Sequence, residues 1–187
     1  MVKNHHIFSY PQQVEYITDL SYITDVFGKR RPLNTMESGN IYFNLKKSIL
    51  TKTLLLGFSK VCNLSEIREF MEKGLKVKNK HIELFSSVLQ ENNLHVPTLM
   101  DTEVTNSSIA PFSDKLMLFH AGSLFTVAIS YYGYASVMSM RADLILHNEK
   151  SIAEDFKILS KYSHLMIKNH WLEKPPYADD RIDLRIH

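Results

Sequence analysis

Histidine and carboxylate side chains are the residues of this chain that could bind a metal ion or move protons. A helical bundle holds two metal ions with a glutamate from each of two helices and a Glu-x-x-His pair from each of the others, because the i, i+3 spacing puts both ligands on one face. No Glu-x-x-His pair occurs among the 187 residues. For example, the residue three positions earlier is Lys78 for His81, Leu144 for His147 and Lys161 for His164. We therefore expect no dinuclear metal site and no enzyme.

Two pairs of the remaining residues could still form a polar site between helices. If the second and fourth helical stretches run antiparallel, His81 falls at about the level of Glu154, and His120 falls near His164. One interpretation is that each is a hydrogen-bonded polar residue in or beside the core, with no cofactor bound. The other is a site for a single transition-metal ion, or a proton-linked pair, with His81 and Glu154 as the first choice.

Other reactive groups indicate ordinary packing. Cys62 lies at a junction between helical stretches with no neighbouring histidine, which favours a packed thiol over a nucleophile. The six glycines are scattered singly, so no phosphate-binding loop is present. Residues 131–134 and the pair Met138 and Met140 could line a hydrophobic pocket, but aromatic and methionine side chains at helical spacing are typical of plain core.

Composition and charge narrow the class of protein further. With 44% hydrophobic residues, 22% charged residues and a net charge of +2, the chain is typical of one globular domain. The charges are interspersed, so we expect no nucleic-acid partner, and we interpret the basic runs 29–31 and 76–80 as solvated faces. One cysteine fits a reducing compartment. No run of about 18 apolar residues and no signal-peptide pattern stands out, so we expect no membrane span and a soluble protein made in the cytoplasm.

Stretches with helical period must position these side chains. Apolar residues recur at spacings of three to five over residues 34–61, 63–91, 113–140 and 143–171. Residues 34–37 and 63–66 both have the form of a capping box, and Ser113 and Asp143 are expected N-caps. Only residues 62–64 separate the first two helices, which must therefore be antiparallel neighbours.

A long connection over residues 93–112 separates the second helix from the third. Its length allows it to run back along a helix of about 40 Å, which would make the third helix parallel to the second. Short link, long crossover, short link is the ordering of a ferritin-like four-helix bundle. We therefore predict an all-α fold of this type, with its long crossover between helices 2 and 3.

The parts outside the bundle are an extension and a tail. Residues 1–33 predict an N-terminal extension with a short helix, whose apolar positions Val14, Ile17, Tyr22 and Phe27 should dock on a bundle. The bundle spans 34–172. In the tail, 173–187, two prolines prevent further helix. The third helix carries many small residues, which places it at the bundle centre or at a contact with a partner.

Three segments, 28–34, 139–144 and 166–181, carry a resemblance to known proteins. They resemble a family of helical-bundle domains from endospore-forming bacteria. The function of this family is unknown, and it is grouped with the ferritin-like folds. Some of its members carry the label putative spore coat protein. Longer members hold two bundles in tandem, and this chain resembles the second copy with the joining segment attached. The family pattern has glycine where His170 stands, so the cap there is expected to be strained.

The resemblance implies a structural or assembly protein, without enzyme activity, that is associated with sporulation and the spore coat. The alternative is a degenerate ferritin-like protein with a metal or small-ligand site and a residual oxidoreductase role. Because one bundle keeps a joining segment, we expect a homodimer built from the extension and the small-residue face of the third helix, with other coat proteins as further partners.

Overall fold

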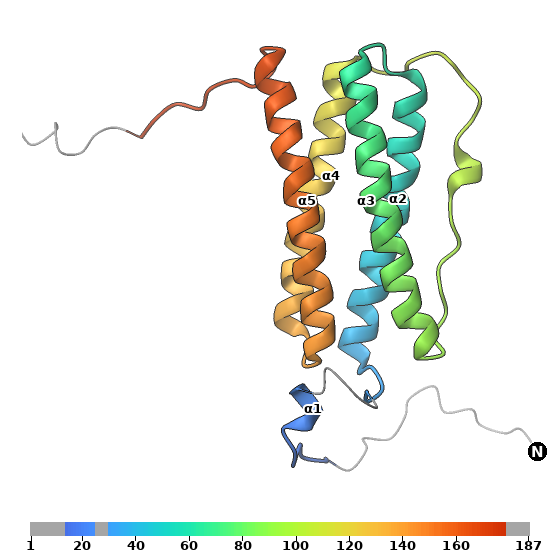
Figure 1. Ribbon diagram of the computed structural model, residues 1–187, viewed down its shortest axis with the longest axis vertical. Coiled ribbons are helices and arrows are strands. Elements are labelled where there is room, and N and C mark those ends of the chain that lie inside the picture. Colours follow the sequence, from blue (N-terminus) through green and yellow to red (C-terminus); the bar gives the residue numbers. More distant parts are fainter. Residues whose placement is uncertain (1–13, 25–29, 179–187) are drawn as a thin grey trace, which may run out of the picture.

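Four long helices form an antiparallel bundle in the computed structural model, which describes residues 14–24 and 30–178 (Figure 1). They are α2 (Thr35–Val61), α3 (Ser65–Glu91), α4 (Asp114–Met138) and α5 (Ala142–Lys168). Two short elements lie outside them, α1 (Ser21–Thr24) and the 3-10 turn η1 (Asp101–Glu103). The predicted all-α four-helix bundle is confirmed.

The long connection between α3 and α4 runs back along the bundle beside α2 and α3 (Figure 1). As a result α4 begins at the same end of the bundle as α3, as the length of the connection predicted. Lys52 on α2 binds Asp101 in η1 at 2.6 Å, and Val104 lies beside Gly57 of α2, so the crossover is fastened about half-way along its course.

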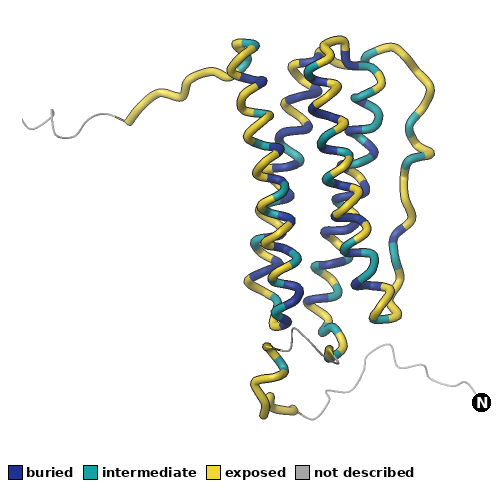
Figure 2. Tube along the Cα trace, viewed as in Figure 1, coloured by how far each residue is buried: buried dark blue, intermediate teal, exposed yellow. Residues whose placement is uncertain are grey.

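Buried residues line the inner face of each helix, whereas the crossover and the described part of the extension are mostly exposed (Figure 2). The apolar core has two clusters. One contains Leu55, Phe70 and Phe125, and the other contains Leu45 and Phe85. Polar side chains occupy the level between them, so the interior has an apolar cluster, a polar layer and a second apolar cluster.

Two of the predicted caps are confirmed, and two are wrong. Asn34 and Glu37 form the capping box of α2, and Ser113 accepts a hydrogen bond from the Leu116 amide at 3.3 Å. At α3, however, residue 64 is the N-cap and its side chain accepts nothing. The carboxylate of Asp114, on α4, instead accepts the amides of residues 63 and 64 at 3.1 and 2.7 Å.

The start of α5 also differs from the prediction. The helix begins at Ala142, with Arg141 rather than Asp143 at the N-cap position. The Asp143 carboxylate is buried and bound to the guanidinium of Arg141 at 3.0 and 2.8 Å, so it does not cap.

The end of α5 has the backbone strain that the sequence predicted. His170 has a φ of 55°, the left-handed region that glycine adopts freely. The next amide, of Trp171, donates to the Met166 carbonyl at 2.8 Å and closes the helix. Asn93 makes the same kind of turn after α3, with a φ of 54°.

A close approach fixes the packing of α4 on α5. A Cβ atom added at Gly122 would lie 2.5 Å from the Tyr162 ring, so only glycine allows the two helices to come this near. Gly122, Ala128 and Ala135 are buried, whereas Ser130 is exposed and Gly133 is half-buried. Some small residues of α4 therefore pack in the centre of the bundle, and others lie on the outer face of the helix.

The N-terminal extension is less docked than expected. In its described part only residues 21–24 are helical, and Val14 and Ile17 are exposed. Tyr22 alone is half-buried, and it lies against Arg31. Phe27, the remaining predicted docking residue, lies outside the described residues.

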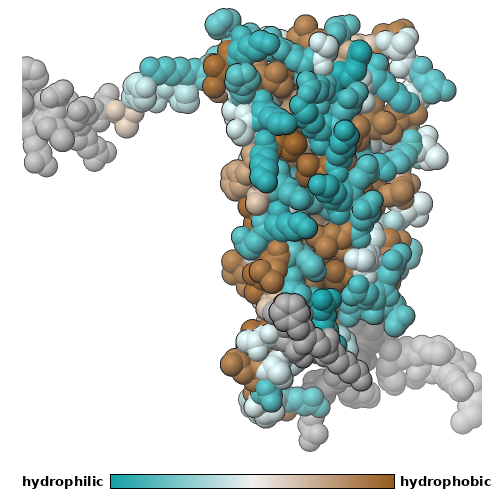
Figure 3. All heavy atoms as spheres, viewed as in Figure 1, coloured by the Kyte–Doolittle hydropathy of each residue, from teal (hydrophilic) through white to brown (hydrophobic). Residues whose placement is uncertain are grey.

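The face of the bundle formed by α3 and α5 is largely hydrophilic (Figure 3). Figure 3 looks onto α3 and α5, where hydrophilic residues cover most of the helices and hydrophobic ones gather along the seams. Among the described residues one helix, α4, is long and apolar enough to cross a membrane by length and composition, with 39% of that window buried in the bundle. The expectation that the chain has no membrane span stays a prediction.

Candidate functional site

The polar layer at mid-bundle contains a buried ion pair. Lys78 on α3 and Asp155 on α5 have no exposed side-chain surface, and the Lys78 ammonium donates to Oδ2 of Asp155 at 2.6 Å. The ammonium also lies 4.4 Å from the centre of the Phe125 ring on α4. The second carboxylate oxygen of Asp155, Oδ1, is buried without a hydrogen-bond partner. A buried cation of this kind persists only because a carboxylate lies beside it.

A chain of hydrogen bonds beside this pair touches all four long helices. Nε2 of His81 lies 3.0 Å from the Glu154 carboxylate on α5, and Nδ1 lies 3.2 Å from the Tyr132 hydroxyl on α4. The hydroxyl is 3.0 Å from that of Ser48 on α2. Since a carboxylate only accepts, neutral His81 donates through Nε2, and its Nδ1 accepts from Tyr132. Glu154, whose side chain is 21% exposed, is the end of the chain that reaches solvent.

Burial decides the protonation states in this layer. It lowers the pKa of Lys78 and raises the pKa of Asp155, and each partner opposes the shift of the other. Burial, followed by the charges of Lys78 and Lys47, lowers the pKa of His81 to about 3, so the imidazole is neutral at pH 7. Lys47, half-buried over the Tyr132 ring at 4.4 Å, has its pKa lowered to about 7 by burial and then by Lys78.

The structure therefore brings together one of the two predicted pairs. His81 and Glu154 are in contact, at the level that the antiparallel arrangement predicted. His120 and His164 have different neighbours: His120 lies 5.9 Å from the Phe58 ring of α2, whereas His164 lines a surface groove with Glu66 and Glu69 of α3. That second pairing was wrong, because the two side chains leave their helices toward different partners.

Sequence reasoning missed the charges at the centre of the layer. Lys78 stands where a metal-binding pair would have a glutamate, and its i, i+3 spacing from His81 puts it on the same helix face. The run 76–80 was interpreted as solvated, and Lys78 is an exception to that interpretation. Asp155 had no sequence signal beyond its place next to Glu154.

The layer is closed, and this limits its chemistry. Across residues 14–24 and 30–178, no three His, Cys, Asp or Glu side chains are grouped closely enough to hold a metal ion. Cys62 is buried, and burial raises the pKa of its thiol, which makes it a poor nucleophile. Tyr132 is a core residue, whereas Tyr131 and Tyr134 are exposed, so the tyrosine motif does not enclose a ligand pocket.

A second polar centre lies at the end of the bundle where the extension arrives. Both terminal nitrogens of Arg31 donate to the Glu37 carboxylate at 2.8 Å, and Glu37 is fully buried. Burial alone would raise the pKa of Glu37, but Arg31 and the amides of Asn34 and Met140 lower it overall. The carboxylate is therefore charged at neutral pH. Arg31 is thus a second exception to the solvated interpretation of the basic runs.

The same centre fastens three distant segments to one another. One Glu37 oxygen accepts the amides of Met140 at 3.0 Å and Arg141 at 3.2 Å, in the turn before α5. The Arg141 guanidinium donates to the Arg31 carbonyl at 3.0 Å and holds Asp143. Two of the three segments that carry the family resemblance, 28–34 and 139–144, therefore meet here.

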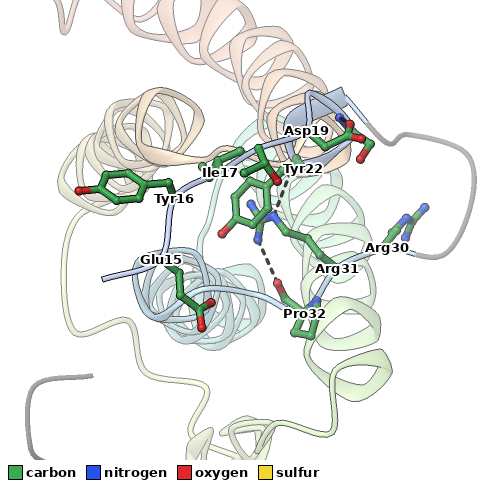
Figure 4. Close-up of a pocket in the computed structure, with 10 residues that line it drawn as sticks. Glu15, Tyr16, Ile17, Asp19, Tyr22, Arg30, Arg31 and Pro32 are labelled. Carbon is green, nitrogen blue, oxygen red and sulfur yellow. Dashed lines mark hydrogen bonds between the residues drawn. The ribbon is translucent and has the colours of Figure 1, made fainter. Parts of the chain in front are cut away.

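The described part of the extension forms an open cavity over this centre. It has a volume of about 610 Å³ and is lined by residues of 15–22 and 30–32 (Figure 4). Arg31 points toward Tyr22, donating to its carbonyl at 3.0 Å, while Arg30 points away (Figure 4). A second open cavity, of about 470 Å³, lies between α2 and the crossover.

Comparison with known proteins gives a family and a fold. A protein-family model described as "Protein of unknown function (DUF3231)" matches residues 21–184. Among solved structures, the chain is similar to a protein from Bacillus halodurans C-125 described as a putative spore coat protein, with a TM-score of 0.72 and 13% identity. That likeness covers 80% of this chain and 98% of the other. No curated protein matches the chain. Because the family model spans most of its length, the chain belongs to the DUF3231 family of proteins of unknown function.

Proposed function

We propose that this protein is a structural or assembly component of the spore, associated with the coat and without enzyme activity. The observation that supports this most directly is the Lys78 ammonium in the middle of the bundle. It stands three residues before His81, where the Glu-x-x-His pair of a ferritin-like metal site would have a glutamate.

A fixed ammonium at this position disfavours a metal ion. It repels a divalent cation, and it already uses the Asp155 carboxylate that a metal would need. The ferritin-like arrangement is thus proposed as the scaffold, with its redox centre replaced by an internal ion pair. Such a protein would act by binding other molecules on its surface, as a rigid building block.

The association with the coat rests on the solved structure of similar fold and its description, at an identity too low to carry function by itself. The location of the protein in the spore tests this association. An epitope-tagged copy in a sporulating host should be recovered in the coat fraction, extracted by alkali and detergent after the cortex and core proteins have been separated. A tagged protein found only in the mother-cell cytosol after spores are released would contradict the proposal.

Metal content tests the non-enzymatic part separately. Protein purified without chelators and analysed by mass spectrometry of the elements should contain much less than one metal ion per chain. Stoichiometric iron, manganese or zinc, lost in His81→Ala but kept in the surface variant His164→Ala, would instead support the metal-binding alternative.

A further inference from the structure

The outer face of α4 is apolar and uncharged along the length of the helix. No Asp, Glu, Lys or Arg occurs between Lys115 and Arg141. Large apolar side chains on this face are exposed, and the exposed fraction reaches 84% at Val137. The outer-face residues are Leu116, Phe119, Ser123, Thr126, Val127, Ser130, Tyr134 and Val137. Contiguous exposed apolar surface of this kind marks an interaction site on a soluble protein.

The spacing of these residues is that of a helix-pairing seam. From Leu116 the positions advance mainly in steps of three or four residues, which keeps them on one face of the helix. The core face of α4 is separate from this seam, since it consists of other residues, among them Leu118, Phe125 and Tyr132. The helix therefore has one seam for its own bundle and a second seam that no long helix among residues 14–24 and 30–178 covers.

The outer seam is symmetric about its own midpoint. Counted from the midpoint between Thr126 and Val127, Leu116 mirrors Val137, Phe119 mirrors Tyr134, and Ser123 mirrors Ser130. Large apolar residues thus lie at both ends, aromatic residues lie inside them, and small hydroxyl residues flank the centre. In an antiparallel pair related by a two-fold axis, residue i of one copy contacts residue j of the other and the reverse, so each residue of this face would meet one of its own kind.

We propose that a second copy of this chain docks on this face, with the two α4 helices antiparallel and the two-fold axis passing between Thr126 and Val127. Phe119 then packs on the partner's Tyr134 at each end of the contact. Ser123 and Ser130 lie opposite each other near the centre, where small side chains let the helices approach closely.

Two features next to the seam agree with this arrangement. His120 is exposed, and its mirror position is Gly133, where an added Cβ would meet nothing within 4 Å. The imidazole of one copy therefore has open space on the other. On α2, Phe43 is 49% exposed and lies edge-on to Tyr131 of α4, with ring centres 4.8 Å apart, which widens the apolar surface beyond one helix.

A second copy fits this face better than a lipid surface does. Helices that lie on membranes have lysine and arginine beside their apolar face, which attract anionic headgroups. The α4 face has no such residue after Lys115, and hydroxyl groups lie at its centre, where a lipid would leave them unpaired. The proposal supplies a partner for the structural role proposed above. It does not depend on that role, because mass and cross-linking are measured on the purified chain.

Cysteine cross-linking tests the antiparallel register. When the full-length variants Ser123→Cys and Ser130→Cys are mixed and mildly oxidised, they should give a disulfide-linked dimer. Neither should cross-link alone, because each residue and its own copy are then about 10 Å apart along the axis, beyond the reach of a disulfide. The wild-type chain is the control for Cys62, which is buried. Efficient cross-linking of each single variant with itself would overturn the antiparallel arrangement.

Charge at the axis tests the face itself. Val127→Glu places two carboxylates beside the axis and should raise the dissociation constant of the dimer by about 100-fold or more. The matched control is Leu146→Glu on the outer face of α5, where the exposed fraction of 57% compares with 45% at Val127. Mixing Val127→Glu with Val127→Lys should restore the dimer.

Light scattering at micromolar concentration decides the outcome. A mass near 21.7 kDa for the wild-type chain, or a dimer unaffected by Val127→Glu, would overturn the proposal. A wild-type monomer that floats with phosphatidylglycerol vesicles, and does so less after Val127→Glu, would assign this face to a membrane instead.

Discussion

At the scale of single residues, Lys78 and Asp155 decide whether the centre of the bundle is stable. Each charge is out of water, and the 2.6 Å contact between them compensates for the hydration that both have lost. The sequence could place His81 beside Glu154 from helix length alone. It could not place Lys78 in the interior, because burial of a cation depends on a carboxylate 77 residues away that only folding brings near.

Lys78→Met should lower the free energy of unfolding by about 3 to 5 kcal/mol, because the Asp155 carboxylate is left buried and unpaired. Urea unfolding followed by circular dichroism at 222 nm measures the change. In the double variant Lys78→Met/Asp155→Leu most of the loss should be recovered, since no uncompensated charge remains. Equal losses in the single and the double variant would show that packing at residue 78, rather than charge, is responsible.

Acid should destabilise the bundle through His81. The unfolded chain takes up a proton on this histidine near pH 6.5, whereas the folded protein, with the pKa at about 3, does not. The free energy of unfolding therefore falls as the pH drops through 6.5 toward 3, by about 2 kcal/mol between pH 7 and 5.

His81→Gln should flatten this dependence, at a cost of about 1 to 3 kcal/mol at pH 7 for the lost hydrogen bonds. His164→Gln is the control, because His164 is exposed, and it should leave the slope unchanged. A wild-type stability that is constant between pH 7 and 5 would mean that His81 is not neutral in the folded state.

At the scale of elements, periodicity predicted the four helices, because an apolar stripe is a local property of the sequence, and the lengths of the connections predicted their directions. The local caps at Asn34 and Ser113 were predictable for the same reason. The start of α3 was not, since its acceptor is Asp114, 50 residues further along the chain. Local reasoning fails where a helix end is satisfied by another helix.

Replacing His170 with glycine should stabilise the protein by about 1 kcal/mol, because glycine adopts a φ of 55° without steric cost. A thermal melt measures the gain, with the carbonyl of Met166 still accepting from residue 171. Asn93→Gly is the matched change at the end of α3, and its gain should be smaller because asparagine tolerates this conformation better. A loss of stability on His170→Gly would show that the histidine side chain contributes a contact worth more than the strain.

At the scale of the whole molecule, the two polar centres have different tasks. The layer at mid-bundle joins the four helices, whereas Arg31, Glu37 and Arg141 join segments that are more than 100 residues apart at one end. Composition predicted a domain with a sizeable core. It gave no sign of the end network, whose members look like ordinary surface charges in the sequence.

Arg31→Ala should therefore cost about 2 to 3 kcal/mol, because the fully buried Glu37 loses both hydrogen bonds from the guanidinium. For a chain of this size the melting temperature should fall by about 5 to 10 °C, which calorimetry can measure. Arg30→Ala is the neighbouring control. Its contacts are at 3.5 Å and its side chain is 38% exposed, so the change should be within about 0.5 kcal/mol. Similar effects for the two variants would mean that the buried end network does not stabilise the fold.

The polar layer between the two apolar clusters constrains how far each helix can shift along its axis relative to its neighbours. Apolar side chains in a bundle can exchange neighbours if one helix slides by a turn of about 5.4 Å. Such a slide of α5 would separate Asp155 from Lys78 and leave two buried charges unpaired. We infer that the layer selects one alignment among those that the apolar clusters alone would allow. The variant Lys78→Met/Asp155→Leu should then be stable but show additional amide signals in nitrogen–proton correlation spectra, whereas a single set of signals would mean that packing alone sets the alignment.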